Sequence, residues 1–126
     1  MMPKHILVID DDADICEVAK VSLESQPEMA VTVAGSGREG LAIAALKQPD
    51  AILLDMMLPD MSGIMVFQML RADPKTQRIP IVFLTAKVKP DDRRWFGEVG
   101  AEFIAKPFKP QQLAGQLLAA LNWQNS

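Results

Sequence analysis

Short apolar runs alternate along the chain with longer segments in which apolar residues recur every three or four positions. The short runs have the length and composition of buried strands, and they cover residues 6–9, 29–33, 51–54, 79–84 and 102–105. The longer segments have the spacing of helices that bury one face, and they cover residues 12–25, 40–47, 63–72, 90–99 and 110–123. The pattern therefore predicts five strand–helix units.

Repeated strand–helix units predict a parallel sheet, because each helix carries the chain back over the sheet before the next strand begins. We therefore predict an α/β fold of the flavodoxin-like (βα)5 type, doubly wound, with a five-stranded parallel sheet of order 2-1-3-4-5 and helices on both faces. The length of 126 residues suits one domain, over residues 1–126. In such open sheets, ligands bind beyond the carboxyl ends of the strands.

Acidic, hydroxyl and ammonium side chains follow four of the five predicted strands, and they are Asp10 and Asp11, Asp55, Thr85 and Lys106. Because the first and third strands are neighbours in the predicted order, the three carboxylates should converge, and Mg²⁺ is the cation that fits them best. A hydroxyl and an ammonium suit phosphoryl oxygens. The set predicts a phosphoryl-transfer site in which an Asp serves as nucleophile. Asp12 instead suits the start of the following helix.

The composition excludes several other classes of protein. The net charge of −3 creates no basic field for nucleic acid or an anionic membrane, and no apolar stretch reaches membrane-spanning length. The lone cysteine, Cys16, excludes a disulfide framework. The single histidine, His5, precedes the first strand and is therefore no candidate for a catalytic base. The N-terminus lacks a signal-peptide pattern, so cytoplasm is the expected location.

Four segments resemble the motifs of the receiver domain of two-component response regulators. They are Val8-Ile9-Asp10-Asp11-Asp12, Leu53-Leu54-Asp55-Met56-Met57-Leu58-Pro59-Asp60-Met61-Ser62-Gly63, Leu84-Thr85-Ala86 and Lys106-Pro107-Phe108. Their order and spacing are highly specific, whereas any one of them alone would be a weak signal. The resemblance covers essentially the whole chain. It implies a phosphoacceptor switch that catalyses only its own phosphorylation and dephosphorylation, and not a turnover enzyme.

The resemblance assigns a role to each candidate site residue. It implies that Asp55 is the phosphoacceptor and that Thr85 and Lys106 contact the phosphoryl group. It implies a Mg²⁺ site formed by Asp10, Asp11, Asp55 and the backbone carbonyl of Met57. It also implies a cis Lys106–Pro107 peptide bond, which the sequence alone only permits.

Phe103 stands where the family has its switch aromatic, so the resemblance implies a coupled movement. Phosphorylation of Asp55 adds charge and acceptor oxygens. Thr85 moves toward them, and Phe103 turns into the space that Thr85 leaves. The surface of the fourth helix, fifth strand and fifth helix then changes. Trp95 and Phe96 are adjacent on that fourth helix, so we expect one of them to be exposed.

The same resemblance implies the partners of the protein. A histidine kinase or a histidine phosphotransfer protein would supply the phosphoryl group, and the changed surface would contact an output partner protein or output domain. We expect no direct contact with nucleic acid or a membrane. We expect either a monomer or a phosphorylation-dependent dimer.

Two features depart from the family pattern. One residue separates Gly100-Ala101 from Phe103 where the family usually has two, which leaves the start of the fifth strand open. Met57 is apolar and Lys87 is cationic, at positions that flank the route of the hydrolytic water. We therefore expect a dephosphorylation rate unlike that of fast-signalling members.

Two other interpretations compete with a phosphorylated receiver. The segment Gly35-Ser36-Gly37-Arg38-Glu39-Gly40 matches G-x-G-x-x-G, and Asp55 lies at the distance of a ribose-binding acid, as in a dinucleotide-binding module that uses Gly35, Gly37 and Gly40. A turn in which Gly35 or Gly37 has positive φ and Ser36 caps the helix explains the same segment more simply. The second competitor is a pseudo-receiver, which is a binding module that keeps the fold and works without phosphorylation.

Overall fold

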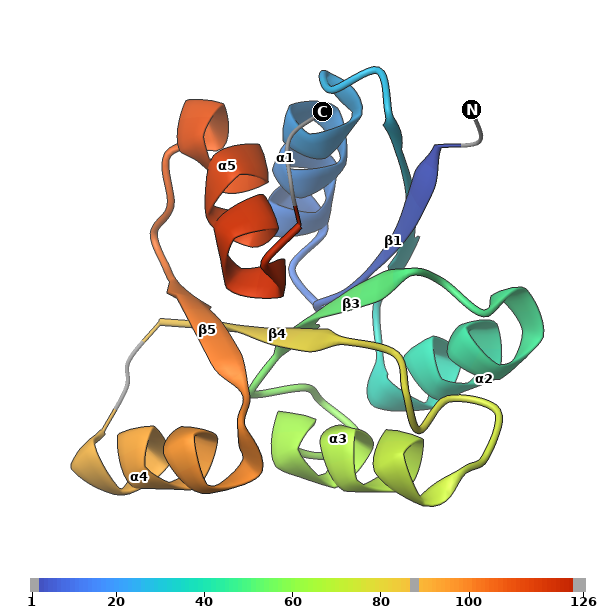
Figure 1. Cartoon of the computed structure of the whole chain (residues 1–126), viewed down its shortest axis with the longest axis vertical. Helices are drawn as coiled ribbons and strands as arrows, with labels where there is room; N and C mark the ends of the chain where they lie inside the picture. The colour runs from blue at the N-terminus through green and yellow to red at the C-terminus, as the bar shows by residue number, and fades with distance from the viewer. Residues whose placement is uncertain (1–2, 87–88, 124–126) are drawn as a thin grey trace.

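The computed structural model describes residues 3–86 and 89–123, and it contains one parallel sheet whose strand order is β2-β1-β3-β4-β5 (Figure 1). The predicted fold class and strand order are confirmed. In chain order the elements are β1 (Lys4–Ile9), α1 (Ala13–Glu24), β2 (Met29–Ala34), α2 (Gly37–Lys47), β3 (Ala51–Asp55), α3 (Gly63–Ala72), β4 (Ile81–Thr85), α4 (Pro90–Val99), β5 (Glu102–Ala105) and α5 (Pro110–Leu121). None of the helices in the described ranges has the length and apolar character that a membrane span requires.

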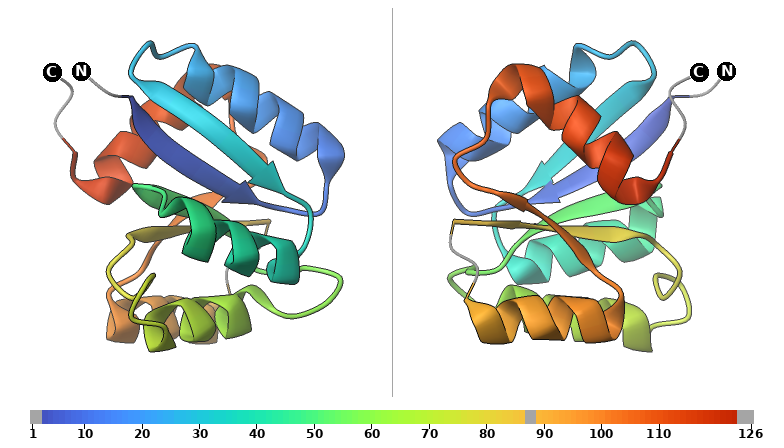
Figure 2. Two further views of the ribbon diagram at one scale, coloured as in Figure 1. Left: turned by 90° about the vertical axis from the view of Figure 1, so that its right-hand side faces the viewer. Right: turned by 60° about the vertical axis from the view of Figure 1, so that its left-hand side comes forward.

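Helices cover both faces of the sheet. Figure 2 shows α1 and α5 together on one side, with α2, α3 and α4 on the other. Successive strand residues point to opposite faces, so Ile6 and Val8 of β1 pack toward α1 and α5, and Leu7 and Ile9 pack toward α2 and α3. The central strands β1, β3 and β4 are therefore buried on both faces, which explains why their sequences are continuous apolar runs.

The strand register places the carboxyl ends of β1, β3 and β4 at nearly the same level. Ile9 pairs with Leu54, so Asp10 and Asp55 both follow a paired position. Asp55 pairs in turn with Leu84, and Thr85 is the next residue of β4. The pairing that buries the core thus brings the candidate site residues to one edge of the sheet.

Side chains at the starts of the helices fix two of the boundaries. Asp12 accepts from the backbone N–H groups of Asp14 (2.9 Å) and Ile15 (3.3 Å), which confirms its predicted role at the start of α1. Ser36 accepts from the N–H of Glu39 at 3.1 Å, so α2 begins at Gly37, three residues before the predicted start. The periodic apolar pattern missed this first turn, because Gly37, Arg38 and Glu39 carry no apolar side chain.

The glycines of α2 permit close packing. A Cβ on Gly40 would overlap the buried Ile9, whose Cγ1 would lie only 2.8 Å away, and a Cβ on Gly37 would lie 2.6 Å from Cγ of Met61. Neither residue has positive φ, and Gly100 is the one positive-φ glycine in the described part of the chain. The prediction of a positive-φ glycine before α2 is therefore wrong, although Ser36 caps the helix as predicted.

An aromatic cluster joins α3, β4, α4 and β5. Trp95 lies 5.3 Å from Phe67 and 5.6 Å from Phe83 between ring centroids, and Phe96 stacks on Phe103 at 5.1 Å. Phe96 is buried and Trp95 is half-buried, so the expectation that one of them is exposed is wrong. The Trp95 ring is large enough to cover the edge of the core while it also reaches solvent.

The turn between α4 and β5 is short. Gly100 ends α4 in the left-handed conformation, with φ of 70°, and its N–H points back to the carbonyls of Gly97 and Phe96. The fifth strand then begins at Glu102, as predicted, and Glu102 pairs with Val82 of β4. The segment has one residue fewer than the family pattern, but β5 still begins in register with β4.

We expect Gly40→Ala to destabilise the protein by about 1–3 kcal/mol, because the added methyl group overpacks the contact with Ile9. Chemical denaturation with urea measures the change in the free energy of unfolding. Gly115→Ala in α5 is the matched control, since a Cβ there meets nothing within 4 Å. The control should be stabilised by roughly 0.5–1 kcal/mol through helix propensity. Equal effects at the two positions would contradict the packing role of Gly40.

Candidate functional site

Three carboxylates lie together at the carboxyl edge of the sheet. Each of Asp10, Asp11 and Asp55 offers an oxygen, and these oxygens all lie within 4.8 Å of one another. Asp10 and Asp55 are buried, at 1% and 7% exposure, whereas Asp11 is exposed. The structure therefore brings together the three acids that the sequence analysis selected.

Lys106 supplies the opposing charge. Its Nζ lies 2.8 Å from Oδ2 of Asp10 and 3.5 Å from Oδ1 of Asp55. Burial alone would lower the pKa of Lys106, but the hydrogen bond and charge of Asp10, followed by the charge of Asp55, outweigh burial and raise it. The Lys106 side chain therefore stays protonated and positively charged. The next peptide bond, Lys106–Pro107, is cis, as the resemblance implied.

The pKa of Asp55 is raised above its ordinary value of 3.8, chiefly by burial and next by the charge of Asp10. Lys106 and the backbone N–H of Met57, which donates to Oδ1 at 3.4 Å, oppose that rise. Because folding raises this pKa, the contribution of Asp55 to stability falls as the pH rises from 3.8 through the folded-state pKa. The site thus carries an excess of negative charge that a cation would relieve.

The donor set fits Mg²⁺. Oδ1 of Asp10 accepts from the N–H of Asp12 at 2.9 Å, which fixes the orientation of the carboxylate. Oδ2 of Asp10 is buried, and apart from Lys106 it has no hydrogen-bond partner in the described residues. A buried carboxylate oxygen beside two further carboxylates is the hard oxygen environment that Mg²⁺ prefers.

The remaining predicted site residues surround the carboxylates. Thr85 is the buried last residue of β4, and it pairs with Ala105 of β5 directly before Lys106. Met57 follows Asp55 by two residues, and its side chain is 80% exposed. Phe103 lies on β5, half-buried against Phe96, with the Arg93 guanidinium 5.7 Å from its ring centroid. Lys87 lies outside the described residues.

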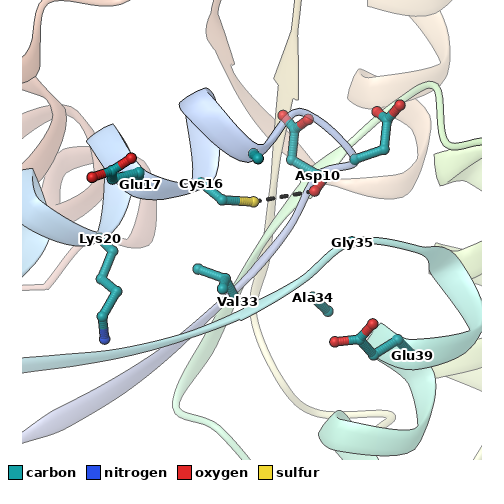
Figure 3. A pocket seen from close by; sticks show the side chains of 10 residues that line it. Asp10, Cys16, Glu17, Lys20, Val33, Ala34, Gly35 and Glu39 are labelled. Atoms are coloured by element: carbon teal, nitrogen blue, oxygen red, sulfur yellow. Dashed lines mark hydrogen bonds between the residues drawn. The ribbon is translucent and has the colours of Figure 1, made fainter.

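A cavity of about 400 Å³ adjoins the acidic edge between α1 and β2, and Asp10, Asp11, Cys16 and Val33 are among its lining residues (Figure 3). Figure 3 shows the thiol of Cys16 directed at the backbone of Asp10, to whose carbonyl Sγ donates at 3.1 Å. Burial, and next the charge of Asp10, raise the pKa of this thiol to about 11. Cys16 is therefore a protonated structural residue and a poor nucleophile.

Two further residues shape the site, and the sequence analysis assigned them no role. A Cβ on Gly63 would overlap the carbonyl oxygen of Asp55, so only glycine lets α3 start directly against the end of β3. Asp60 accepts from the N–H groups of Gly37 and Arg38, both at 2.9 Å. No local pattern could reveal the Asp60 contacts, because the partners lie 23 and 22 residues earlier.

The start of α2 is unsuited to a dinucleotide. Binding of a pyrophosphate at a helix N-terminus requires free backbone N–H groups. Here the N–H groups of Gly37 and Arg38 are bound by Asp60, and that of Glu39 is bound by Ser36. The glycines serve close packing instead, so the geometry gives the dinucleotide interpretation no support.

The comparisons with known proteins agree with the fold and the site. Residues 6–118 match the family model of the response regulator receiver domain. The phosphate regulon transcriptional regulatory protein PhoB of Pseudomonas aeruginosa is 41% identical over 122 residues, which are 96% of this chain and 53% of that protein. The DNA-binding response regulator MtrA of Mycobacterium tuberculosis is 41% identical over 121 residues, which are 95% of this chain and 51% of that protein. The chain thus spans about half the length of these relatives.

The structure of the chemotaxis protein CheY4 of Vibrio cholerae superposes with a TM-score of 0.85 at 28% identity, covering 94% of this chain and 98% of that one. Fold and site together define a receiver of the two-component signalling type. The chain belongs to the response regulator receiver domain family.

We expect Asp10→Asn to lower the pKa of Asp55, because it removes a carboxylate charge that raises this pKa and leaves Lys106 to pair with Asp55 alone. NMR titration of the side-chain carboxyl carbon, in buffer with a chelator, measures the change. Asp12→Asn is the control, since Asp12 is exposed and should leave the pKa of Asp55 where it is. An unchanged or higher pKa in Asp10→Asn would contradict the electrostatic account.

Proposed function

We propose that residues 1–126 form a phosphoacceptor domain in which Asp55 accepts a phosphoryl group from a phosphohistidine donor. The observation that carries the proposal is the convergence of three carboxylates with the ammonium of Lys106 around Asp55. In this proposal Asp10, Asp11, Asp55 and the backbone carbonyl of Met57 hold Mg²⁺. The donor is a histidine kinase or a histidine phosphotransfer protein, and the domain works in the cytoplasm.

The transfer exchanges one phosphorus bond for another. A carboxylate oxygen of Asp55 forms a bond to phosphorus while the P–N bond to the donor histidine breaks and its electron pair returns to the imidazole. Lys106 neutralises charge on the phosphoryl oxygens, and Thr85 donates its hydroxyl to one of them. Mg²⁺ held by Asp10, Asp11, Asp55 and the backbone carbonyl of Met57 would supply further charge neutralisation. Attack by water on phosphorus later releases inorganic phosphate and restores the carboxylate.

The change at Asp55 acts as a switch through Thr85 and Phe103. Thr85 moves toward the phosphoryl group, and Phe103 turns from its stack on Phe96 into the space beside β4. The contacts of Phe103 with α4 support this route, because any turn of the ring must change the packing of Phe96 and Arg93. Phe103 has no hydroxyl, so its two positions differ by packing alone.

The altered surface is that of α4, β5 and α5, and it contacts the output partner. PhoB is named a transcriptional regulatory protein and MtrA a DNA-binding response regulator. By analogy, we propose that this domain controls an output domain or a separate partner protein and does not itself contact nucleic acid. It acts as a monomer or as a phosphorylation-dependent dimer, and it turns over no substrate beyond its own phosphorylation.

Incubation with acetyl phosphate and Mg²⁺ tests the proposal, and intact-mass spectrometry detects the product. We expect a single phosphoryl adduct that is absent in Asp55→Asn and in a reaction with excess chelator. Asp12→Asn should still form the adduct, because this exposed residue lies at the start of α1 and its amide oxygen can still accept from the helix N–H groups. Failure of the wild-type protein to form an adduct with any phosphodonor would favour the pseudo-receiver.

We expect Met57→Asn to shorten the lifetime of the phosphorylated state. The exposed Met57 side chain offers no hydrogen bond to a water approaching the phosphoryl group, whereas an amide can orient that water. One neutral hydrogen bond corresponds to a change of about two- to tenfold in rate. Decay of the adduct after removal of the donor gives the half-life, and an unchanged half-life would contradict this role of Met57. Met65→Asn is the control, since Met65 is an exposed methionine on α3.

A further inference from the structure

The loop between β3 and α3, residues 56–62, is held at its base by backbone contacts. The N–H of Gly63 donates to the carbonyl of Met56 at 2.7 Å, and Met57 pairs with Ser62 in an antiparallel bridge. Ser62 also caps α3 through the N–H of Met65 at 3.1 Å. The backbone of Met57, two residues after the phosphoacceptor, is therefore fixed from one side by the start of α3.

Asp60 fixes the same loop to a different helix. Its Oδ1 and Oδ2 accept separately from the N–H groups of Gly37 and Arg38, both at 2.9 Å, in the first turn of α2. Met61, the next loop residue, packs so closely on Gly37 that a Cβ there would lie 2.6 Å from its Cγ. The loop is thus clamped between the starts of α2 and α3.

The Asp60 contact is strong for an exposed side chain. The backbone N–H of Arg38, and next that of Gly37, lower the pKa of the Asp60 carboxyl, so it is ionised at neutral pH. A carboxylate also interacts favourably with the positive end of the α2 dipole. Two charge-assisted bonds from one carboxylate set both the distance and the orientation of the loop relative to α2.

We propose that Asp60 is a positioning residue that holds the loop so that the Met57 carbonyl can bind Mg²⁺, and that it thereby couples the start of α2 to the phosphoacceptor site. The inference rests on the proposed function, which assigns the Met57 carbonyl to the metal. The inference adds Asp60 to the proposed site as a residue that touches neither the metal nor the phosphoryl group. Outer-shell groups that orient metal ligands commonly change metal affinity by about 10- to 100-fold when they are removed.

Coupling of this kind is reciprocal. If the bonds from Asp60 to α2 favour Mg²⁺ binding, then bound Mg²⁺ must strengthen those bonds by the same free energy. The N–H groups of Gly37 and Arg38 should therefore exchange with solvent more slowly when Mg²⁺ is present. A residue that merely capped α2 would leave these two amides slowed by no more than amides elsewhere in the domain, which Mg²⁺ protects only by stabilising the folded state.

The experiment titrates the unphosphorylated protein with MgCl₂ by isothermal titration calorimetry. We expect about tenfold weaker binding in Asp60→Ala than in the wild-type protein. Asp60→Asn should lose less, because its amide oxygen can accept from one of the two N–H groups but its NH₂ cannot accept from the other. Asp73→Ala is the matched control, since the Asp73 carboxylate accepts one backbone N–H, that of Lys75 at 2.9 Å, at the opposite end of α3.

NMR hydrogen exchange of the Gly37 and Arg38 amides, with and without Mg²⁺, gives the second readout on the wild-type protein, so the test does not depend on a variant that folds. Slowing at these two amides that exceeds the slowing in helix α5, together with weaker binding in Asp60→Ala and unchanged binding in Asp73→Ala, supports the proposal. Wild-type affinity in Asp60→Ala overturns it, even if that variant is less stable. A wild-type protein that binds no Mg²⁺ overturns both this inference and the proposed metal site.

Discussion

The mutual repulsion of acidic side chains at one edge of a buried sheet is the constraint around which this structure is built. Asp10 and Asp55 follow paired positions of adjacent strands, so the register that buries the core also brings their carboxylates together. Lys106 reaches them from the edge strand and compensates part of the charge. The remaining excess of negative charge makes the site favour a cation, and it raises the pKa of the residue on which the proposed chemistry depends.

The two faces of the sheet differ in how they are joined to that edge. The face under α1 and α5 is packed mainly with aliphatic side chains. The opposite face contains the aromatic cluster, which connects Phe103 on β5 to Phe96 on α4 and, through Trp95, to Phe67 on α3. It also contains α2 and α3, whose first turns hold the loop after Asp55. The loop after Asp55 and the ring of Phe103 therefore both contact helices on the same face of the sheet.

Most of the fold and much of the site could be predicted from local sequence patterns. Buried strands are continuous apolar runs, and Asp10, Asp55, Thr85 and Lys106 stand at or directly after their ends, so strand order alone brings them together. The features that were missed depend on contacts between distant segments. Examples are the packing of Gly40 on Ile9, the partial burial of Trp95 and the bonds of Asp60 to α2, none of which leaves a periodic signal in the chain.

The short turn at Gly100 and the acidic edge lie at opposite ends of β5. The turn lies at the amino end of β5, where the pairing of Glu102 with Val82 sets the register of the strand. Lys106 reaches Asp10 because the pairing of β5 with β4, and not the length of the turn, sets the position of Lys106 along the sheet. A change of length in this turn can therefore be absorbed at the amino end of β5 without moving Lys106 away from the acidic edge.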